Sequence, residues 1–472
     1  TGANVAVTEN AAMDLGASTI SGTASFNSTS NAITDSGTLA ITGATTINSG
    51  SADLTLDDAA STFGALAITG ANVAVTENAA MDLGASTISG TASFNSTSNA
   101  ITDSGTLAIT GATTLNSGSA DLTLDQSAST FGTLAITGAN VAVTENAAMD
   151  LGASTISGTA SFNSTSNAIT DSGTLAITGA TTLNSGSADI TLNEAASTFG
   201  TLAITGTNVA VTENAAMDLG ASTISGTASF NSSNNAITDS GTLAITGVTT
   251  LNSGSADLTL DEAASTFGAL AITGANVAVT ENAAMDLGAS TISGTASFNS
   301  TSNAITDSGT LAITGVTTIN SGSADLTLNE ASSTFGTLVL TGANVAVTDA
   351  GAADLGVSTV SGTFGITSGG AITDSGTLAV TGDATFTNTS GSNDAITLDD
   401  ASNAFAGTVT FATDSGSAVT IVDTTALDLK ALSAASLSVT AGGAVTDSGT
   451  LAISGATTLN SGSADLTLDQ SA

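Results

Sequence analysis

The chain has 472 residues but contains no cysteine, histidine, proline, tryptophan or tyrosine. Without cysteine there is no disulfide framework and no thiol chemistry. Without histidine or cysteine, a serine or threonine hydroxyl lacks the base that ordinarily activates a nucleophile. Aromatic residues make up 3% of the chain, and all of them are phenylalanine. The remaining composition is rich in small aliphatic residues, glycine, serine, threonine, asparagine and aspartate, which is typical of short strands and turns.

Basic residues are almost absent, with one lysine against 40 acidic residues and a net charge of −39. Proteins that bind nucleic acids or anionic lipid surfaces neutralise phosphates with many lysines and arginines. The composition therefore excludes nucleic acid and anionic membranes as partners, and it leaves cations, neutral sugars and further copies of the chain. No run of about 18 apolar residues occurs, so the sequence predicts no transmembrane helix.

The main positive feature is a repeat of 68 residues. Thr-Gly-Ala-Asn-Val-Ala-Val-Thr starts at Thr1, Thr69, Thr137 and Thr273, with one change in the copy from Thr205 and a looser copy from Thr341. We predict five near-identical repeats over 1–340, a degenerate sixth repeat with turn insertions over 341–412, and a degenerate partial seventh over 413–472. We expect one continuous rod, taken from a longer chain because the array starts and stops inside repeats.

Apolar residues within a repeat occur as pairs two positions apart, such as Met13/Leu15, Leu39/Ile41 and Leu54/Leu56. This spacing puts both side chains on one face of a short strand, and clusters of turn residues separate the pairs. A weaker sub-repeat predicts three coils in each repeat. We therefore predict an all-β parallel β-helix (β-solenoid) with about three rungs per repeat, climbing roughly 14 Å at about 4.8 Å per rung. The alternative is a series of tandem β-sandwich domains, which usually need about 100 residues each.

Three stretches resemble a known group of proteins: Gly369–Gly382, Ala395–Asp400 and Ala426–Leu429. They are similar to the tandem β-strand repeats of giant bacterial surface proteins, of the filamentous-haemagglutinin-like and adhesin type. The resemblance covers the whole chain, and it implies secretion to the cell surface and a role in adhesion, matrix or filament formation. It identifies no receptor.

Acidic residues are the remaining candidates for chemistry. Many β-helix proteins cleave polysaccharides, and glycoside hydrolysis uses a pair of carboxylates. The candidates for such a pair are Asp57 and Asp58 together with Asp35. We favour instead that these residues cap turns, because near-identical repeats offer no unique cleft. We predict that the chain is not an enzyme and has no catalytic or cofactor-binding residues.

Calcium is the one cofactor that the sequence leaves open, because carboxylates beside carbonyl-rich turns are suitable ligands. In the predicted register Asp103 lies near Asp125 of the next rung, and Asp35 and Asp57 are their counterparts. These four residues are the candidate calcium ligands. The one basic residue, Lys430, is expected to pair with Asp428 at the surface.

The sequence therefore predicts an extracellular structural rod, either the stalk of a bacterial adhesin or the body of a cell-surface filament. The alternative is a calcium-dependent surface-layer or matrix component, and a lesser alternative is a carbohydrate-active β-helix. Expected partners are other copies of the chain, side by side or end to end, and glycans or the surface of a host or neighbouring cell.

Overall fold

The computed structural model describes residues 1–470, so Ser471 and Ala472 of the predicted seventh repeat lie outside the described residues. The chain divides into two compact units, residues 1–233 and 234–472. All regular elements in the described part are β-strands, and that part therefore contains no helix that could cross a membrane. Each unit is described by itself below.

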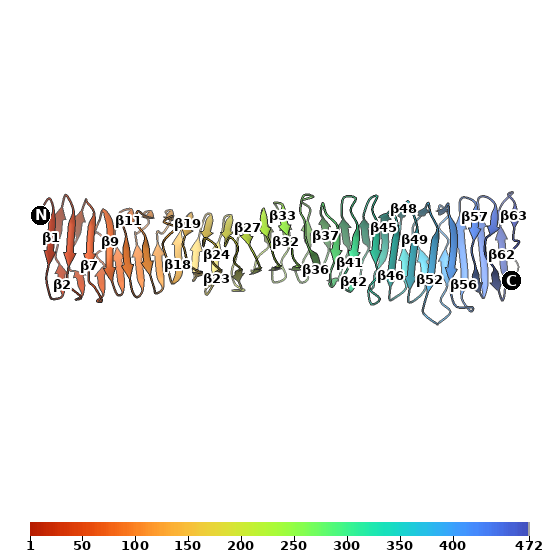
Figure 1. The fold of residues 1–472 in the computed structure, drawn as a ribbon, viewed down its shortest axis with the longest axis horizontal. Helices are drawn as coiled ribbons and strands as arrows, with labels where there is room; N and C mark the ends of the chain where they lie inside the picture. Colours follow the sequence, from red (N-terminus) through yellow and green to blue (C-terminus); the bar gives the residue numbers. More distant parts are fainter. Residues whose placement is uncertain (471–472) are drawn as a thin grey trace. The chain divides into compact units, whose positions relative to one another are not determined.

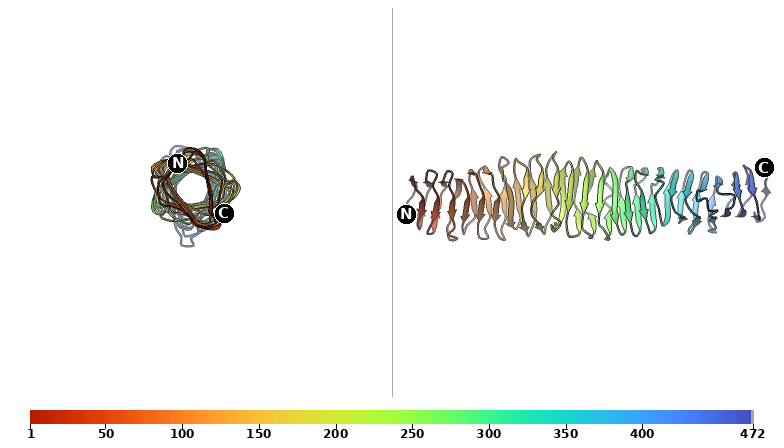
Figure 2. Two further views of the ribbon diagram at one scale, coloured as in Figure 1. Left: turned by 90° about the vertical axis from the view of Figure 1, so that its left-hand side faces the viewer. Right: turned by 90° about the horizontal axis from the view of Figure 1, so that it is seen from below.

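Each unit is a parallel β-solenoid, in which short strands run around a common axis and stack on strands of the next rung (Figures 1 and 2). Every pairing described within the units is parallel, for example Val73 with Ala92 and Ala92 with Thr113. The predicted β-solenoid is thus confirmed. The alternative of tandem β-sandwiches is wrong, because sandwich sheets are built from antiparallel strands.

The first two repeats show the strand order that recurs in the others. The first contains β1 (Val5–Thr8), β2 (Met13–Leu15), β3 (Ser18–Ile20), β4 (Ala24–Asn27), β5 (Ile33–Asp35), β6 (Leu39–Ile41), β7 (Thr45–Asn48) and β8 (Leu54–Leu56). The second contains β9 (Ala65–Gly70), β10 (Val73–Thr76), β11 (Met81–Leu83), β12 (Ser86–Ile88), β13 (Ala92–Asn95), β14 (Ile101–Asp103), β15 (Leu107–Ile109), β16 (Thr113–Asn116) and β17 (Leu122–Leu124).

A typical rung has a bent side, made of two three-residue strands, and a flat side, made of one four-residue strand. In one rung β11 and β12 form the bent side and β13 forms the flat side; β14, β15 and β16 repeat this arrangement on the next. In a third rung β17 and the single bridging residue Thr130 form the bent side. The predicted three rungs per repeat correspond to these three coils.

The strand β10 adds a half-turn that the sequence analysis missed. Because of it, equivalent strands of successive repeats lie in opposite sheets of the solenoid. In the first unit β1 and β19 (Val141–Thr144) belong to one sheet, whereas β10 and β28 (Val209–Thr212) belong to the other. Following one sheet from Val5 to Val141, which lies two repeats further on, takes seven stacking steps.

This count refines the predicted climb. At about 4.8 Å per step, two repeats climb roughly 34 Å and one repeat roughly 17 Å, rather than the predicted 14 Å. A side chain at a given repeat position returns to the same face only after two repeats.

The long strand β9 is where a flat side becomes a bent side. On one edge it pairs with the single strand β7 over Leu66–Thr69. On the other edge its two ends pair with different strands, Leu66 with Leu83 of β11 and Thr69 with Thr87 of β12. In the first unit β18 (Thr133–Gly138) and β27 (Thr201–Gly206) repeat this connection.

Apolar pairs form the core, as their spacing predicts. Met81 and Leu83 are at most 1% exposed, and Phe94 is fully buried. Burying a Val, Leu, Ile, Phe or Met side chain contributes about 1.5–3 kcal/mol, so stacked columns of these residues are the main favourable term in the fold. Val5 and Val7 of β1 are partly exposed, whereas their counterparts Val73 and Val75 are buried.

In the second unit the looser copies keep this architecture. A flat side is formed by β46 (Val345–Asp349), β49 (Phe364–Ser368), β52 (Ala384–Asn388) and β55 (Thr408–Ala412). The ring of Phe386 lies 5.6 Å from those of Phe364 and Phe411, which fills this part of the core. The predicted insertions after Asn388 and Thr413 lie at corners between strands, so they leave the stack intact.

Candidate functional site

The distinctive site of this solenoid is an acidic side chain buried at the start of each half-turn. Its members share one repeat position, directly after or at the end of the strand that adds the half-turn, and we call them the junction carboxyls. They are Glu77, Glu145, Glu213, Glu281, Asp349 and Asp423, all at most 1% exposed.

Strand periodicity explains why these residues point inward. Successive side chains of a strand alternate between its faces, so residues two apart share a face. Val73 and Val75 of β10 face the core, and Glu77 continues the same alternation. The backbone remains in register there, since Glu77 N–H donates to Asn95 O at 2.9 Å, as in the strand that precedes it.

Glu77 lies between a turn of the preceding rung and a column of small polar residues. Asn78 N–H donates to Ser61 O at 2.9 Å, which fixes the turn that ends at Phe63 against Glu77. In the next rung Ser96 is fully buried, and its hydroxyl donates to Asn99 O. Two rungs on, the Ser117 hydroxyl donates to Ala120 O at 2.9 Å, so the serine hydroxyls satisfy their own turns.

This column ends at Gly138, where a larger residue would crowd the serine below it. A Cβ atom on Gly138 would lie 2.8 Å from Ser117 Oγ. In the second unit the residues stacked on a junction carboxyl differ, but their register is the same. Asp349 pairs with Ser368 of the next rung, and Ser368 pairs with Asn388 of the rung after it.

The junction carboxyls have few hydrogen-bond partners. Both carboxyl oxygens of Glu77, Glu145 and Glu281 are buried without a partner. Glu213 Oε2 accepts the backbone N–H of Phe199 at 3.0 Å, and Asp423 Oδ1 accepts that of Phe405 at 3.3 Å. One oxygen of each aspartate member is buried and unpaired, while the other accepts a local backbone N–H, that of Gly351 at 2.8 Å for Asp349 and that of Thr425 at 2.9 Å for Asp423.

This environment favours the protonated form of the acid, because burial removes water from the charged form. Burial raises the pKa of Glu77 to about 8, and the nearby Phe63 N–H offsets a small part of the rise. The pKa values of Glu145, Glu213 and Glu281 also rise to about 8, mainly through burial. Burial raises the pKa of Asp349 and Asp423 as well.

The predicted calcium ligands are brought together in pairs, as turn caps. Asp103 Oδ1 accepts the backbone N–H of Asp125 at 2.9 Å, and Asp103 Oδ2 accepts that of Gln126 at 3.3 Å. Asp35 receives the N–H groups of Asp57 and Asp58 in the same way, at 2.9 and 3.4 Å. The second partner of each pair, Asp125 or Asp57, is exposed.

These caps place two carboxylates side by side in each turn, but they form no larger group. The described residues contain no cluster of three or more acidic side chains arranged to hold a metal ion. Partial burial raises the pKa of Asp103, although the two N–H donors lower it. Calcium binding at Asp35, Asp57, Asp103 and Asp125 stays a prediction.

The predicted partner of Lys430 is wrong. Lys430 Nζ lies 3.4 Å from Asp383 Oδ2, and both side chains are about half exposed. The correction has a simple cause. Ala384 stacks on Val409 and Val409 stacks on Leu429, so Asp383 and Lys430 lie two rungs apart in one stack, whereas Asp428 is a neighbour only along the chain. Exposed pairs of this kind contribute little to stability.

Comparison with known families now identifies the repeat. One family model, described as repeats of unknown function (DUF5649), matches seven consecutive segments: 2–69, 70–137, 138–205, 206–273, 274–341, 342–412 and 416–472. The chain belongs to this family. No curated protein and no solved structure matches it.

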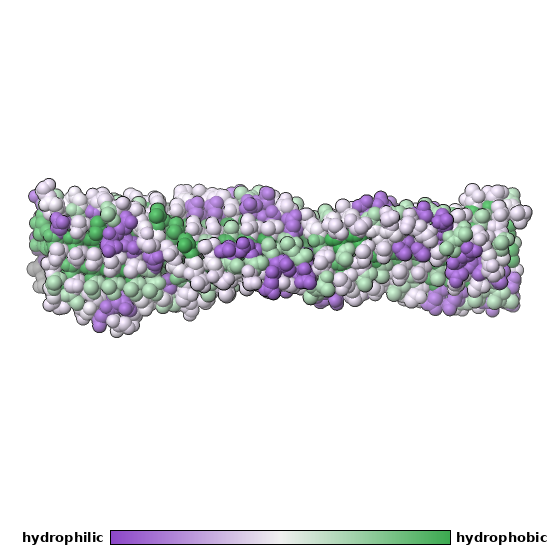
Figure 3. Space-filling view, turned by 180° about the vertical axis from the view of Figure 1, so that it is seen from behind, coloured by the Kyte–Doolittle hydropathy of each residue, from purple (hydrophilic) through white to green (hydrophobic). Residues whose placement is uncertain are grey.

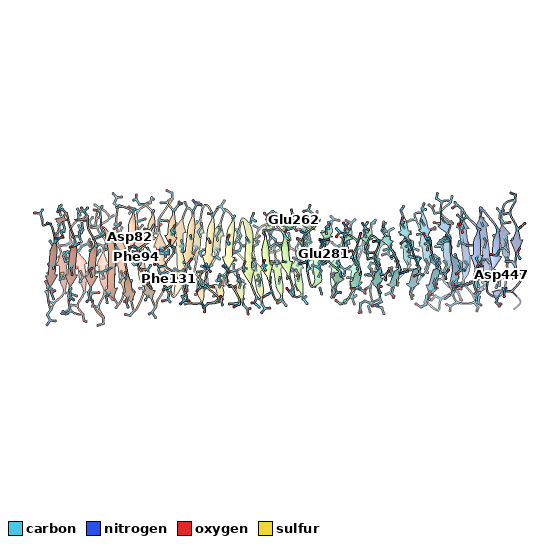
Figure 4. All side chains as sticks on the ribbon, turned by 45° about the horizontal axis from the view of Figure 1, so that its top comes forward. Asp82, Phe94, Phe131, Glu262, Glu281 and Asp447 are labelled. Atoms are coloured by element: carbon cyan, nitrogen blue, oxygen red, sulfur yellow. The ribbon has the colours of Figure 1, made fainter. Side chains whose placement is uncertain are left out.

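Six of the seven DUF5649 repeats thus combine a buried acid with a surface of mixed character, whereas the counterpart in the first repeat, Glu9, is exposed. Figure 3 shows hydrophilic residues scattered among residues of intermediate hydropathy, with small apolar areas between them. Figure 4 shows the contrast within the second unit, where Glu262 lies toward the edge and Glu281 further in. Glu262 is exposed and Glu281 is fully buried.

Sequence reasoning missed the junction carboxyls because they stand among the turn residues that separate the apolar pairs. The signal was present in the spacing, since Val73, Val75 and Glu77 alternate without a break. In the looser repeats the same alternation leads to Asp349 and Asp423, which preserves the acid although the length of the side chain changes.

Proposed function

We propose that this chain is an extracellular structural rod, the stalk of a bacterial adhesin or the body of a cell-surface filament. The observation that carries the proposal is that each rung stacks on the next through the same parallel register and the same buried columns. A structure of this kind lengthens by repeating one interface, and it needs no unique cleft.

Two further observations support a mechanical role over a catalytic one. The aspartates weighed as catalytic residues are engaged in local turns, with Asp35 capping one turn and Asp58 Oδ2 accepting the Thr38 hydroxyl at 2.9 Å. The insertions of the sixth and seventh repeats lie at corners, where they alter the surface and leave the stack in place.

The test is to delete two whole repeats of the first unit, residues 70–205, from the protein in its native cell. We expect the protein to remain at the surface and any stalk or filament to shorten by roughly 34 Å per chain, the climb of seven rungs. Electron microscopy of whole cells measures the length, and antibody labelling of unbroken cells measures the location. A protein that is found only inside the cell, or a deletion that leaves the length unchanged, would contradict the proposal.

A further inference from the structure

The junction carboxyls have a consequence beyond structural support. Six carboxyl groups, three in each unit, are buried at the same point of their repeats, and every member has an oxygen that lacks a hydrogen-bond partner. A buried carboxylate without partners is costly, whereas the neutral acid is much less so. The protonation of these carboxyl groups must therefore be linked to whether the turns that cover them stay closed.

We propose that the junction carboxyls are proton-dependent latches: each holds its half-turn closed when it is neutral, and its ionisation opens the turn beside it to water. For Glu77 the part that opens is the turn of 57–63, which is attached through Asn78 and Ser61. The adjoining columns of apolar pairs stay stacked, so the response is local and repeats along the chain.

The turns that pack on the latches carry acidic residues and no basic residue. The turn that packs on Glu77 carries Asp57 and Asp58, the turn on Glu145 carries Asp125, the turn on Glu213 carries Glu194, and the turn on Glu281 carries Asp261 and Glu262. For the aspartate members the corresponding turns carry Glu330 beside Asp349, and Asp399 and Asp400 beside Asp423. The next-rung turns, such as 95–99, carry no titratable residue. These turns therefore offer no cation that could stabilise the ionised form.

The sequence makes this response unusually easy to isolate. Histidine, cysteine and tyrosine are absent, and Lys430 is the one basic side chain. Apart from the terminal amine, no group with an ordinary pKa titrates between pH 6 and 9. Burial raises the pKa of the four glutamate members to about 8, which places them inside this range.

The eight glutamates provide a matched pair of variants. In one variant the four buried members are changed, Glu77→Gln, Glu145→Gln, Glu213→Gln and Glu281→Gln. In the control the four exposed or half-exposed glutamates are changed, Glu9→Gln, Glu194→Gln, Glu262→Gln and Glu330→Gln. Potentiometric titration of the folded full chain from pH 6 to 9 then counts the protons released.

We expect the natural chain and the control to release between three and four protons more than the buried-site variant. We also expect the amides of Phe63, Phe131, Phe199 and Phe267 to exchange at least tenfold faster at pH 9 in the natural chain than in the buried-site variant. Equal proton release by all three chains would overturn the proposal, and so would equal exchange.

If the buried-site variant does not fold, infrared spectroscopy of the natural chain decides. The expected result is a protonated-carboxyl band at pH 7 that disappears by pH 9.5. Absence of that band at pH 7 would overturn the proposal.

Discussion

The backbone N–H of Phe199 donates a hydrogen bond to Glu213 Oε2 at 3.0 Å, inside a fully buried corner of the solenoid. This single bond connects a turn of one rung to an acidic side chain of the next. The other oxygen, Glu213 Oε1, is buried without a partner. The corner is therefore held by packing, by this bond and by the Asn214 N–H, which donates to Ser197 O at 2.8 Å, and it depends on the charge of the acid.

The first prediction concerns the effect of pH on stability. The folded-state pKa of Glu77, Glu145, Glu213 and Glu281 is raised from 4.5 to about 8, so the folded chain holds protons that the unfolded chain has released. The stabilisation is fully present below pH 4.5 and is lost as the pH rises to about 8. We expect the urea midpoint to fall between pH 5 and 8.5, and to fall less when the four glutamates are glutamine. A midpoint that rises over this range would contradict the assigned burial.

A second prediction separates the two residues of a predicted calcium pair. Asp103 accepts two backbone N–H groups and is half-buried, whereas Asp125 is exposed. Because hydrogen bonds to a charged group contribute about 1.5–3 kcal/mol, Asp103→Ala should destabilise its turn by about that amount. Asp125→Ala should change stability by about 0.5 kcal/mol or less, as is usual for exposed sites. Urea denaturation of the two variants measures the difference, and equal effects would mean that the cap is not important.

A third prediction tests the calcium alternative. The Asp103 and Asp35 carboxylates accept backbone N–H groups, so their turns supply hydrogen-bond donors to the charge without a cation. We therefore expect a calcium chelator to leave the melting temperature within about 1 °C of its starting value, since loss of a tightly bound ion would lower it far more. Differential scanning calorimetry with and without chelator is the measurement. A fall of several degrees, restored by calcium but not by sodium, would support the calcium-dependent alternative.

A fourth prediction concerns packing on the flat side. Phe162 of β22 (Ala160–Asn163) is 1% exposed, and it stacks in register between Val143 and Leu183. Phe162→Ala leaves a cavity in this column and should cost about 3–5 kcal/mol. Thr182→Ala on β25 (Thr181–Asn184), whose side chain is exposed, is the control and should have little effect. Hydrogen exchange of the β22 amides shows where the structure is loosened. If these amides stay as well protected in Phe162→Ala as in the natural chain, the predicted loss of stability is contradicted.

The fold followed from the sequence because its signals are local and repeated. Pairs such as Met81/Leu83 show a strand face directly, and the turn clusters show where each strand ends. The half-turn was not visible, because Val73 and Val75 resemble any other pair and only the stacking partners reveal which sheet they join. The junction carboxyls were missed because acidity normally indicates exposure, and the Asp383–Lys430 contact depends on the length of the intervening coils.

The half-turn at each repeat is the central structural claim, and distances between spin labels test it most directly. The chain has no cysteine, so Thr87→Cys with Thr155→Cys, and Thr87→Cys with Thr223→Cys, label chosen pairs of exposed equivalent positions within the first unit. We expect the second pair to lie on the same face and roughly 34 Å apart along the axis, given about 4.8 Å per rung. The first pair should lie on opposite faces, so its distance should clearly exceed the axial climb of roughly 17 Å. A distance of about 14 Å for Thr87 and Thr155, the spacing of three rungs on one face, would contradict the half-turn.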